Sequence, residues 1–188
     1  MFYVIVITAA TLLTAVFNTV FSPPVSADSA MHFLLCSVAG VIAVIAVDGI
    51  LAFFIRKLPE KWFSPESKVF TVSKKEGRFY RKLKINSWKK KVPELGCFTG
   101  FHKDKLQSTS DKEYLARFLL ESNYGVAIHV ANALFGFLIM FFPFSSSPGI
   151  YIPIAAVNAV LSILPVAILR SNTPALLLLY NRKTTKVQ

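Results

Sequence analysis

The sequence predicts an all-α integral membrane protein with four transmembrane helices and a basic, amphipathic cytoplasmic insert between the second and third helices. Apolar residues make up 54% of the 188 residues, and the mean hydropathy of +0.53 is high for a soluble domain. Four apolar runs offer helices that can cross about 30 Å of hydrocarbon. Between the second and third runs, residues 56–125 hold 17 of the 21 Lys and Arg and eight of the ten Asp and Glu.

The first two apolar runs predict a helix pair. Met1–Phe21 has no charged side chain, Pro23 and Pro24 stop it, and Met31–Ile55 forms the second span. A cleaved signal peptide is the alternative for the first run, because small residues follow it at positions 27–30. The basic residues that normally begin a signal peptide are missing, which favours a span.

The insert contains two patterned segments. Ser110 and Glu113 form a capping-box pattern ahead of an apolar stripe, which predicts a helix over Asp111–Tyr124 that runs straight into the third span. Phe79–Lys91 alternates aromatic or aliphatic residues with Lys and Arg, a pattern typical of an element at the membrane interface, with Trp88 as its anchor. The lysines expected to contact anionic inner-leaflet headgroups are Lys82, Lys84, Lys89, Lys90 and Lys91.

The last two apolar runs predict a second helix pair. Val126–Phe144 is the third span and Gly149–Leu169 the fourth. Proline inside the fourth span is tolerated where neighbouring helices cover the freed carbonyl groups. Arg170–Pro174 (RSNTP) is predicted to end this span and to turn the C-terminal tail along the interface.

The charge distribution predicts orientation. All 21 Lys and Arg lie in Arg56–Arg117 or after Leu169, and the two short connections carry none. The positive-inside rule then predicts a multi-pass protein of the cell membrane with both termini in the cytoplasm. We divide the chain into a first transmembrane helix pair (1–55), a basic interfacial platform (56–125), and a second transmembrane helix pair with an interfacial tail (126–188).

Several classes of site are not indicated. Cys36 and Cys97 form no CxxC pair, so we predict neither a zinc site nor a disulfide framework, and no other metal site. The sequence has no P-loop, no GxGxxG and no GxSxG, and it lacks the His-x4-Asp pattern of glycerolipid acyltransferases. The formal charge of +11 fits anionic headgroups better than nucleic acid, because nucleic-acid-binding motifs are absent.

The third span carries a polar stripe made of Glu121, Gly125, His129 and Asn132. On one helix these positions lie within about 80° of one another. His129 can therefore act as a general base, with Glu121 two turns away as its orienting group. The alternative is a stripe that only joins helices by hydrogen bonds. His102-x-Asp104 is a weaker pair, because a His and an Asp two apart in a loop are usually solvated.

Two charged residues at the edges of the spans are further candidates. Asp48 lies within the second span, where a carboxylate usually faces the bundle interior and finds a partner. His129, Arg56 and Arg170 are the partners we consider, and a solvated position near the interface is the alternative. Arg170 is either a topology anchor or a group that binds an anionic part of a substrate.

Short motifs in and after the insert resemble a known family. They are, in order, Leu58–Phe63 (LPEKWF), Glu76–Tyr80 (EGRFY), Trp88–Glu94 (WKKKVPE), Phe98–Leu106 (FTGFHKDKL), Tyr114–Phe118, Glu121 with His129, and Arg170–Pro174 (RSNTP). This ordered set resembles the glycosyl-4,4'-diaponeurosporenoate acyltransferases, small membrane enzymes that finish staphyloxanthin-type carotenoids. The resemblance covers about Asp48 to Arg182.

The resemblance implies transfer of a fatty acyl group to a sugar hydroxyl of a membrane-embedded glycosylated terpenoid or glycolipid at the cytoplasmic interface. No cofactor is expected beyond the acyl donor, which is a co-substrate. We expect His129 to be the base, supported by Glu121 and Asp48. The residues expected to bind substrate are Arg170, Asn172, Asn132, Trp88, Lys89 and Lys82.

The chain departs from the family pattern at two places. An Arg and a second Glu tend to lie between the family's Glu and His, where this chain has Tyr124 and Val126. The tail motif has Thr173 and Ala175 in a segment that is often rich in Arg. These departures leave the substrate open while the scaffold and acyl transfer are kept. The alternatives are a small integral lipid methyltransferase and a non-catalytic lipid- or partner-binding membrane protein.

Overall fold

The computed structural model describes residues 27–92, 111–141 and 148–185, together with positions 6, 8, 9, 12, 13 and 16 of the first apolar run. Every element in these ranges is helical. Among the described residues, three helices are long and apolar enough to cross a membrane, namely Met31–Arg56, Lys112–Phe141 and Ile150–Arg182. The all-α prediction is confirmed for this part of the chain. The count of four spans stays a prediction, because Met1–Phe21 lies mostly outside the described residues.

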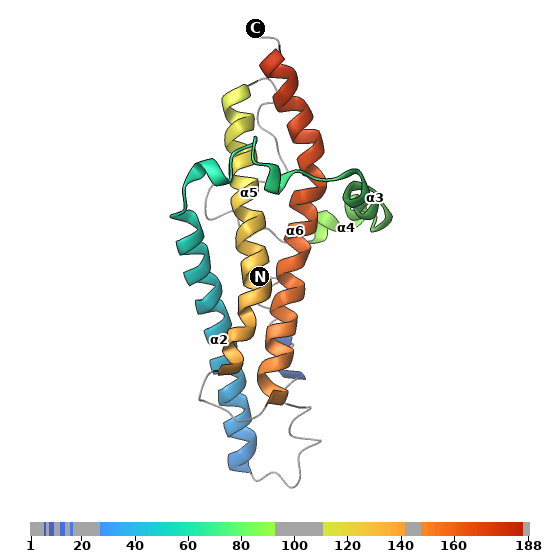
Figure 1. Ribbon diagram of the computed structural model, residues 1–188. Coiled ribbons are helices and arrows are strands. Elements are labelled where there is room, and N and C mark those ends of the chain that lie inside the picture. The colour runs from blue at the N-terminus through green and yellow to red at the C-terminus, as the bar shows by residue number, and fades with distance from the viewer. Residues whose placement is uncertain are drawn as a thin grey trace. The chain divides into compact units, whose positions relative to one another are not determined.

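Three long helices carry most of the described chain (Figure 1). Helix α2 covers Ala27–Arg56, and α5 covers Lys112–Phe135 and continues as the 3₁₀ turn η5 over Gly136–Phe141. Helix α6 covers Pro148–Thr185. At 1.5 Å per residue, the 30 residues of α2 extend about 45 Å, which exceeds the hydrocarbon thickness of a bilayer.

Between α2 and α5 the described chain forms short elements. They are η1 (Glu60–Trp62), η2 (Lys68–Phe70), α3 (Lys74–Lys82), α4 (Ile85–Trp88) and η3 (Lys89–Lys91). Lys84, at φ 48°, separates α3 from α4 in a left-handed conformation that costs a non-glycine residue about 1–2 kcal/mol. Its carbonyl accepts hydrogen bonds from the backbone N–H (2.9 Å) and hydroxyl (2.7 Å) of Ser87, which stabilise this turn.

The chain divides into two compact units, and each long helix contributes to both. Unit 1 comprises residues 1–54 and 128–163. Its core is apolar, with Val44, Ile139, Ile150 and Ile154 buried. A Cβ added at Gly40 would lie 3.0 Å from side-chain atoms of Tyr151 and Ile154, so this glycine lets α2 approach α6 closely.

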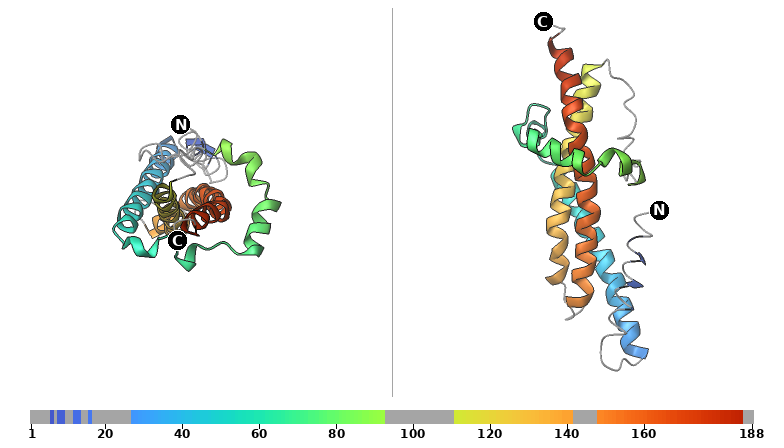
Figure 2. Two further views of the ribbon diagram at one scale, coloured as in Figure 1. Left: turned by 90° about the horizontal axis from the view of Figure 1, so that it is seen from above. Right: turned by 90° about the vertical axis from the view of Figure 1, so that its right-hand side faces the viewer.

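Unit 2 comprises residues 55–127 and 164–188. Phe63, which follows η1, stacks on Tyr124 of α5 with ring centroids 4.0 Å apart, and Phe70 and Leu169 complete this buried cluster. In both views of Figure 2 the segment from η1 to α4 curves around the parts of α5 and α6 that belong to the same unit. The predicted platform thus contributes buried aromatic side chains to the hydrophobic core of unit 2.

Helix α5 begins as predicted but with a different cap. The helix expected over Asp111–Tyr124 is present and continues without interruption into the third span. Its first amides are capped by Asp111, whose Oδ1 accepts hydrogen bonds from the N–H groups of Glu113 (2.9 Å) and Tyr114 (3.3 Å). Ser110, the predicted cap, lies outside the described residues.

The turn predicted at Arg170–Pro174 is wrong, because α6 runs on to Thr185, whereas the position at which the span leaves the membrane stays a prediction. Pro174 removes one backbone donor from the helix. The missing donor is the one that would bond the Arg170 carbonyl, four residues back, yet the helix continues through this position. Ser171 Oγ bonds Ile168 O (2.7 Å) and Thr173 Oγ1 bonds Leu169 O (3.0 Å) within the same helix. The interfacial tail expected after residue 170 is therefore helical as far as Thr185.

Candidate functional site

Helix α3 is formed by a local signal that the sequence analysis missed. Ser73 caps it, because its Oγ accepts a hydrogen bond from the N–H of Glu76 at 3.1 Å. Ser73 and Glu76 have the spacing of a capping box. The cap fixes where α3 starts, and it thereby sets which face of α3 carries Glu76 and Tyr80 toward α6 of the same unit.

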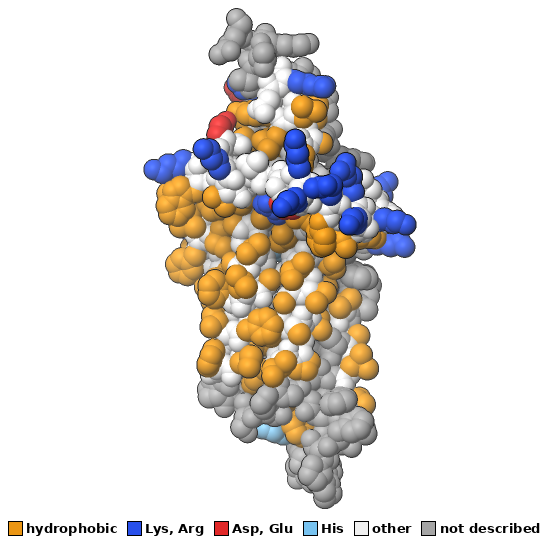
Figure 3. All heavy atoms as spheres, turned by 45° about the vertical axis from the view of Figure 1, so that its right-hand side comes forward, with side chains coloured by type: hydrophobic (Ala, Val, Ile, Leu, Met, Phe, Trp, Pro, Cys, Tyr) orange, Lys and Arg blue, Asp and Glu red, His pale blue; other side chains and the backbone are white. Residues whose placement is uncertain are grey.

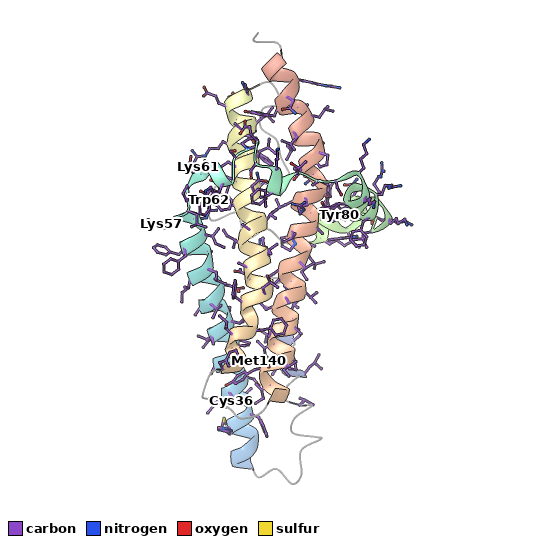
Figure 4. The ribbon with its side chains drawn as sticks, viewed as in Figure 1. Cys36, Lys57, Lys61, Trp62, Tyr80 and Met140 are labelled. Carbon is purple, nitrogen blue, oxygen red and sulfur yellow. The ribbon has the colours of Figure 1, made fainter. Side chains whose placement is uncertain are left out.

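Glu76 joins α3 to α6 through a two-pronged ion pair with Arg170. Arg170 donates its Nε–H to Glu76 Oε1 and its Nη2–H to Oε2, the latter at 2.9 Å. Tyr80 donates its hydroxyl to the same Oε1 at 2.6 Å, and Arg170 Nη2 also reaches Thr71 O at 3.3 Å. The side chains of Arg170 and Glu76 are only 16% and 25% exposed, so this is a largely desolvated joint. Figure 4 shows Tyr80 on α3 beside α6.

The contacts in the joint fix the protonation states of Glu76 and Tyr80 at neutral pH. The hydrogen bonds from Arg170 lower the pKa of Glu76, against the opposing effect of burial, and the Tyr80 hydroxyl adds to this lowering. Burial, with the hydrogen bond to Glu76, raises the pKa of Tyr80 to about 12. Glu76 is therefore ionised and Tyr80 neutral near pH 7. Neither is suited to be a general base there, so we assign the joint a positioning role.

A second contact links the platform to α6 in unit 2. Lys89 Nζ donates to Asn172 Oδ1 at 3.3 Å, so the structure brings together two residues that the sequence predicted to bind substrate. Trp88 is half-buried and donates its indole N–H to Leu83 O at 3.0 Å. Lys82 is exposed at the end of α3. The expected contact of Trp88 and Lys82 with headgroups stays a prediction.

A hollow lies between α3 and α6, and we call it the α3–α6 cleft. Its larger part has a volume of about 670 Å³, and an adjoining part of about 170 Å³ extends toward α4. Val72, Gly77, Ser171 and Pro174 line both parts. The charged side chains in its lining are all basic: Lys74, Arg78, Arg81 and Lys84. Figure 3 shows Lys and Arg side chains gathered over this region of unit 2. The cleft can therefore bind an anion.

Glu121 has a partner other than the predicted one. Its Oε2 accepts a hydrogen bond from Arg56 Nη1 at 3.1 Å, in an ion pair within unit 2. The Arg56 guanidinium also lies 5.9 Å from the ring centroid of Tyr124. Glu121 thus fastens the end of α2 to α5. Its expected role as the orienting group of His129, which belongs to unit 1, stays a prediction.

The polar residues of unit 1 meet at Asn158 of α6. Asn158 Nδ2 donates to Asp48 Oδ1 at 3.2 Å and approaches Asn132 O at 3.4 Å. Asp48 therefore has Asn158 as its partner, which was not among the partners considered from the sequence; Arg56 and Arg170 pair with Glu121 and Glu76 instead. Asn132 is buried, and its Oδ1 has no hydrogen-bond partner in the part of the chain that the structure describes. His129 is half-buried on α5.

The sequence analysis missed Glu76, Tyr80, Gly77 and Asn158 as site residues. The Ser73-x-x-Glu76 capping pattern could have found α3 and one member of the joint. His102 and Asp104 lie outside the described residues, so their pairing is untested. Among the residues that the structure does describe, no group of three or more His, Cys, Asp or Glu side chains could hold a metal ion.

Comparison with known proteins identifies a family over most of this region. The sequence model described as glycosyl-4,4'-diaponeurosporenoate acyltransferase matches residues 59–182, more than half of the chain. No curated protein and no solved structure matches. The matched range includes the whole lining of the α3–α6 cleft and both sides of the Glu76–Arg170 joint.

Proposed function

The chain belongs to the glycosyl-4,4'-diaponeurosporenoate acyltransferase family, and we propose that it moves a fatty acyl group onto a sugar hydroxyl of a membrane-embedded glycosylated terpenoid or glycolipid. Because the family is one of acyltransferases in carotenoid biosynthesis, the protein is an acyltransferase. The observation that carries the acceptor proposal is the family match over residues 59–182, since the acceptor of the named enzyme is itself a glycosylated terpenoid.

The surfaces of the two units support an acceptor with a lipid part and a polar part. In unit 1, α2 exposes Leu35, Ile42, Ile45 and Phe53, which suit contact with lipid tails. All 21 Lys and Arg fall in the residue ranges of unit 2, which suits a cytoplasmic interface in a multi-pass protein with both termini cytoplasmic. An activated acyl thioester from the cytoplasm would approach on that basic side.

The proposed reaction is a base-assisted attack of the acceptor hydroxyl on the acyl thioester. His129 takes the hydroxyl proton as the oxygen bonds to the carbonyl carbon, and the carbon–sulfur bond then breaks. The departing thiolate takes the proton back from His129, so the enzyme ends in its starting state. The neutral imidazole is the form that accepts the proton. Asp48 and Glu121 are proposed to support His129.

The proposal is tested with purified full-length protein in nanodiscs. The protein is incubated with an acyl thioester and a glycosylated terpenoid, and products are identified by mass spectrometry. We expect a product heavier than the acceptor by one acyl group and cleavable by mild base, as an ester is. Transfer to bulk phospholipid with none to the glycosylated terpenoid would contradict the acceptor. A methylated product formed from S-adenosylmethionine would favour the methyltransferase alternative.

A further inference from the structure

We infer that the α3–α6 cleft binds the phosphate groups of a coenzyme A thioester, which serves as the acyl donor. The inference deepens the proposed acyl transfer and rests on it for the identity of the acyl group. It is carried by the charge of the cleft, by its size, and by a glycine in its wall.

The cleft concentrates positive charge without compensation. Its lining includes Lys74, Arg78, Arg81 and Lys84 and contains no Asp or Glu. Among the described residues, none of these four cations has an ion-pair partner. The nearby carboxylate of Glu76 is engaged by Arg170 and Tyr80. The field of the four cations is therefore available to an incoming anion, and arginine forks bind phosphate oxygens two at a time.

The cleft fits a polyphosphate nucleotide better than a single lipid phosphate. Four cations are more than one phosphodiester needs, whereas coenzyme A carries several phosphate groups on one molecule. The larger part of the cleft, about 670 Å³, lies within the size range of small-molecule sites. The lining is apolar at Val72, Ile85 and Pro174. It offers hydrogen-bonding side chains at Asn86 and Ser171. This mixture suits the amide-containing arm of coenzyme A.

Gly77 keeps the cleft open. A glycine inside a helix costs about 1 kcal/mol relative to alanine. Packing does not require this one, because a Cβ built there would meet no atom within 4 Å. Gly77 lines both parts of the cleft, so what its missing side chain preserves is volume for a ligand.

The experiment measures binding of desulfo-coenzyme A, an unreactive probe, to full-length protein in nanodiscs of neutral phosphatidylcholine without acceptor. We expect saturable binding to wild type. The double variant Arg78→Ala/Arg81→Ala should weaken it at least about tenfold, as expected for loss of charge-assisted hydrogen bonds. Gly77→Leu should weaken it similarly by filling the cleft with all charges kept. Lys75→Ala, which removes an exposed α3 cation outside the cleft lining, should bind as wild type.

Several outcomes would overturn the inference. One is affinity for the probe that is unchanged in both Gly77→Leu and the double arginine variant. Another is no binding of desulfo-coenzyme A together with binding of phosphatidylglycerol that the double arginine variant loses, which would assign the cleft to lipid headgroups. If the protein bound acyl carrier protein but not desulfo-coenzyme A, the cleft would be assigned to a protein-borne acyl donor. Because acceptor is absent, the proposed function can fail independently: a bound donor with no transfer to glycolipid contradicts the acceptor and leaves the cleft assignment standing.

Discussion

Unit 1 and unit 2 hold their segments together by different forces. In unit 1 the helices meet through apolar and small side chains, as where Gly40 lies against Tyr151 and Ile154. In unit 2, polar side chains connect segments far apart in the sequence. These connections are Arg56–Glu121, Glu76–Arg170, Lys89–Asn172, Asn123 to the carbonyl of Phe63 (2.8 Å), Tyr124 to that of Leu58 (3.0 Å), and Tyr180 to Glu66 (2.8 Å).

The difference follows from the backbone in each unit. Long helices satisfy their own amide and carbonyl groups, so unit 1 needs close packing more than it needs polar partners. The short turns of unit 2 leave carbonyl groups unpaired, and these take donors from α5 side chains such as Asn123 and Tyr124. A platform built in this way can hold charged side chains in fixed positions beside a cleft.

The largest effect is expected from His129 in unit 1, the residue proposed as the general base. His129→Ala should lower turnover by about 10²–10⁴-fold, because a general base contributes that much to the rate. The measurement is initial acyl transfer by purified protein, with expression and membrane insertion checked in parallel. His102→Ala is the control and should lose little. If His129→Ala kept near-full turnover, His129 would be a helix-packing residue, and His102 with Asp104 would become the leading pair.

The next effect tests the polar joint of unit 2. Arg170→Ala should lower the free energy of unfolding by about 3 kcal/mol, because it leaves a largely buried Glu76 carboxylate without its cation. Unfolding is followed by detergent titration in mixed micelles, and limited proteolysis should show α3 becoming accessible. Arg182→Ala, an exposed position on the same helix, is the matched control. Equal stability of the two variants would mean that α3 docks without the pair.

Substituting one asparagine in each unit compares how much polar contacts stabilise unit 2 and unit 1. Asn123 is buried and donates to two platform carbonyls, Phe63 O and Ser64 O. Asn123→Ala should lower the free energy of unfolding by about 1–3 kcal/mol, because these carbonyl groups lose this donor. Asn158→Ala in unit 1 removes the hydrogen bond to Asp48 and the longer contact to Asn132 O, and the free energy of unfolding should fall by about 0.6 kcal/mol for each, the average for hydrogen bonds between membrane helices. Unfolding free energies in micelles measure both, and a reversed order would contradict the comparison.

The smallest effect is a pH dependence confined to unit 2. The pKa of Glu76 is lowered in the folded protein, so its stabilising contribution is fully present above its unfolded pKa of about 4.3. The contribution is lost as pH falls through the lower folded value. The protection of α3 amides against hydrogen exchange, relative to the intrinsic exchange rate at each pH, should therefore fall below about pH 4.3. Glu76→Gln should remove most of this pH dependence, and an acid response that survives the substitution would locate it in another group.

The sequence by itself determined the helical class, the apolar runs and the family. Helix periodicity and hydropathy are local properties, so Met31–Ile55 and the helix over Asp111–Tyr124 could be read directly from residue spacing. The ordered motifs predicted the acyltransferase family, which the match over residues 59–182 confirms. The basic character of the platform was also evident, because charge needs no knowledge of contacts.

Only the tertiary structure decided which charged groups meet. Glu76 and Arg170 are 94 residues apart in sequence, and Arg56 and Glu121 are 65 apart. No local pattern distinguishes these pairings from Arg170 with Asp48, because every lysine and arginine carries the same charge. The continuation of α6 past Pro174 to Thr185 is likewise known only from the structure. The α3–α6 cleft lies between the two helices that the Glu76–Arg170 pair joins, and such a hollow is a property of packing.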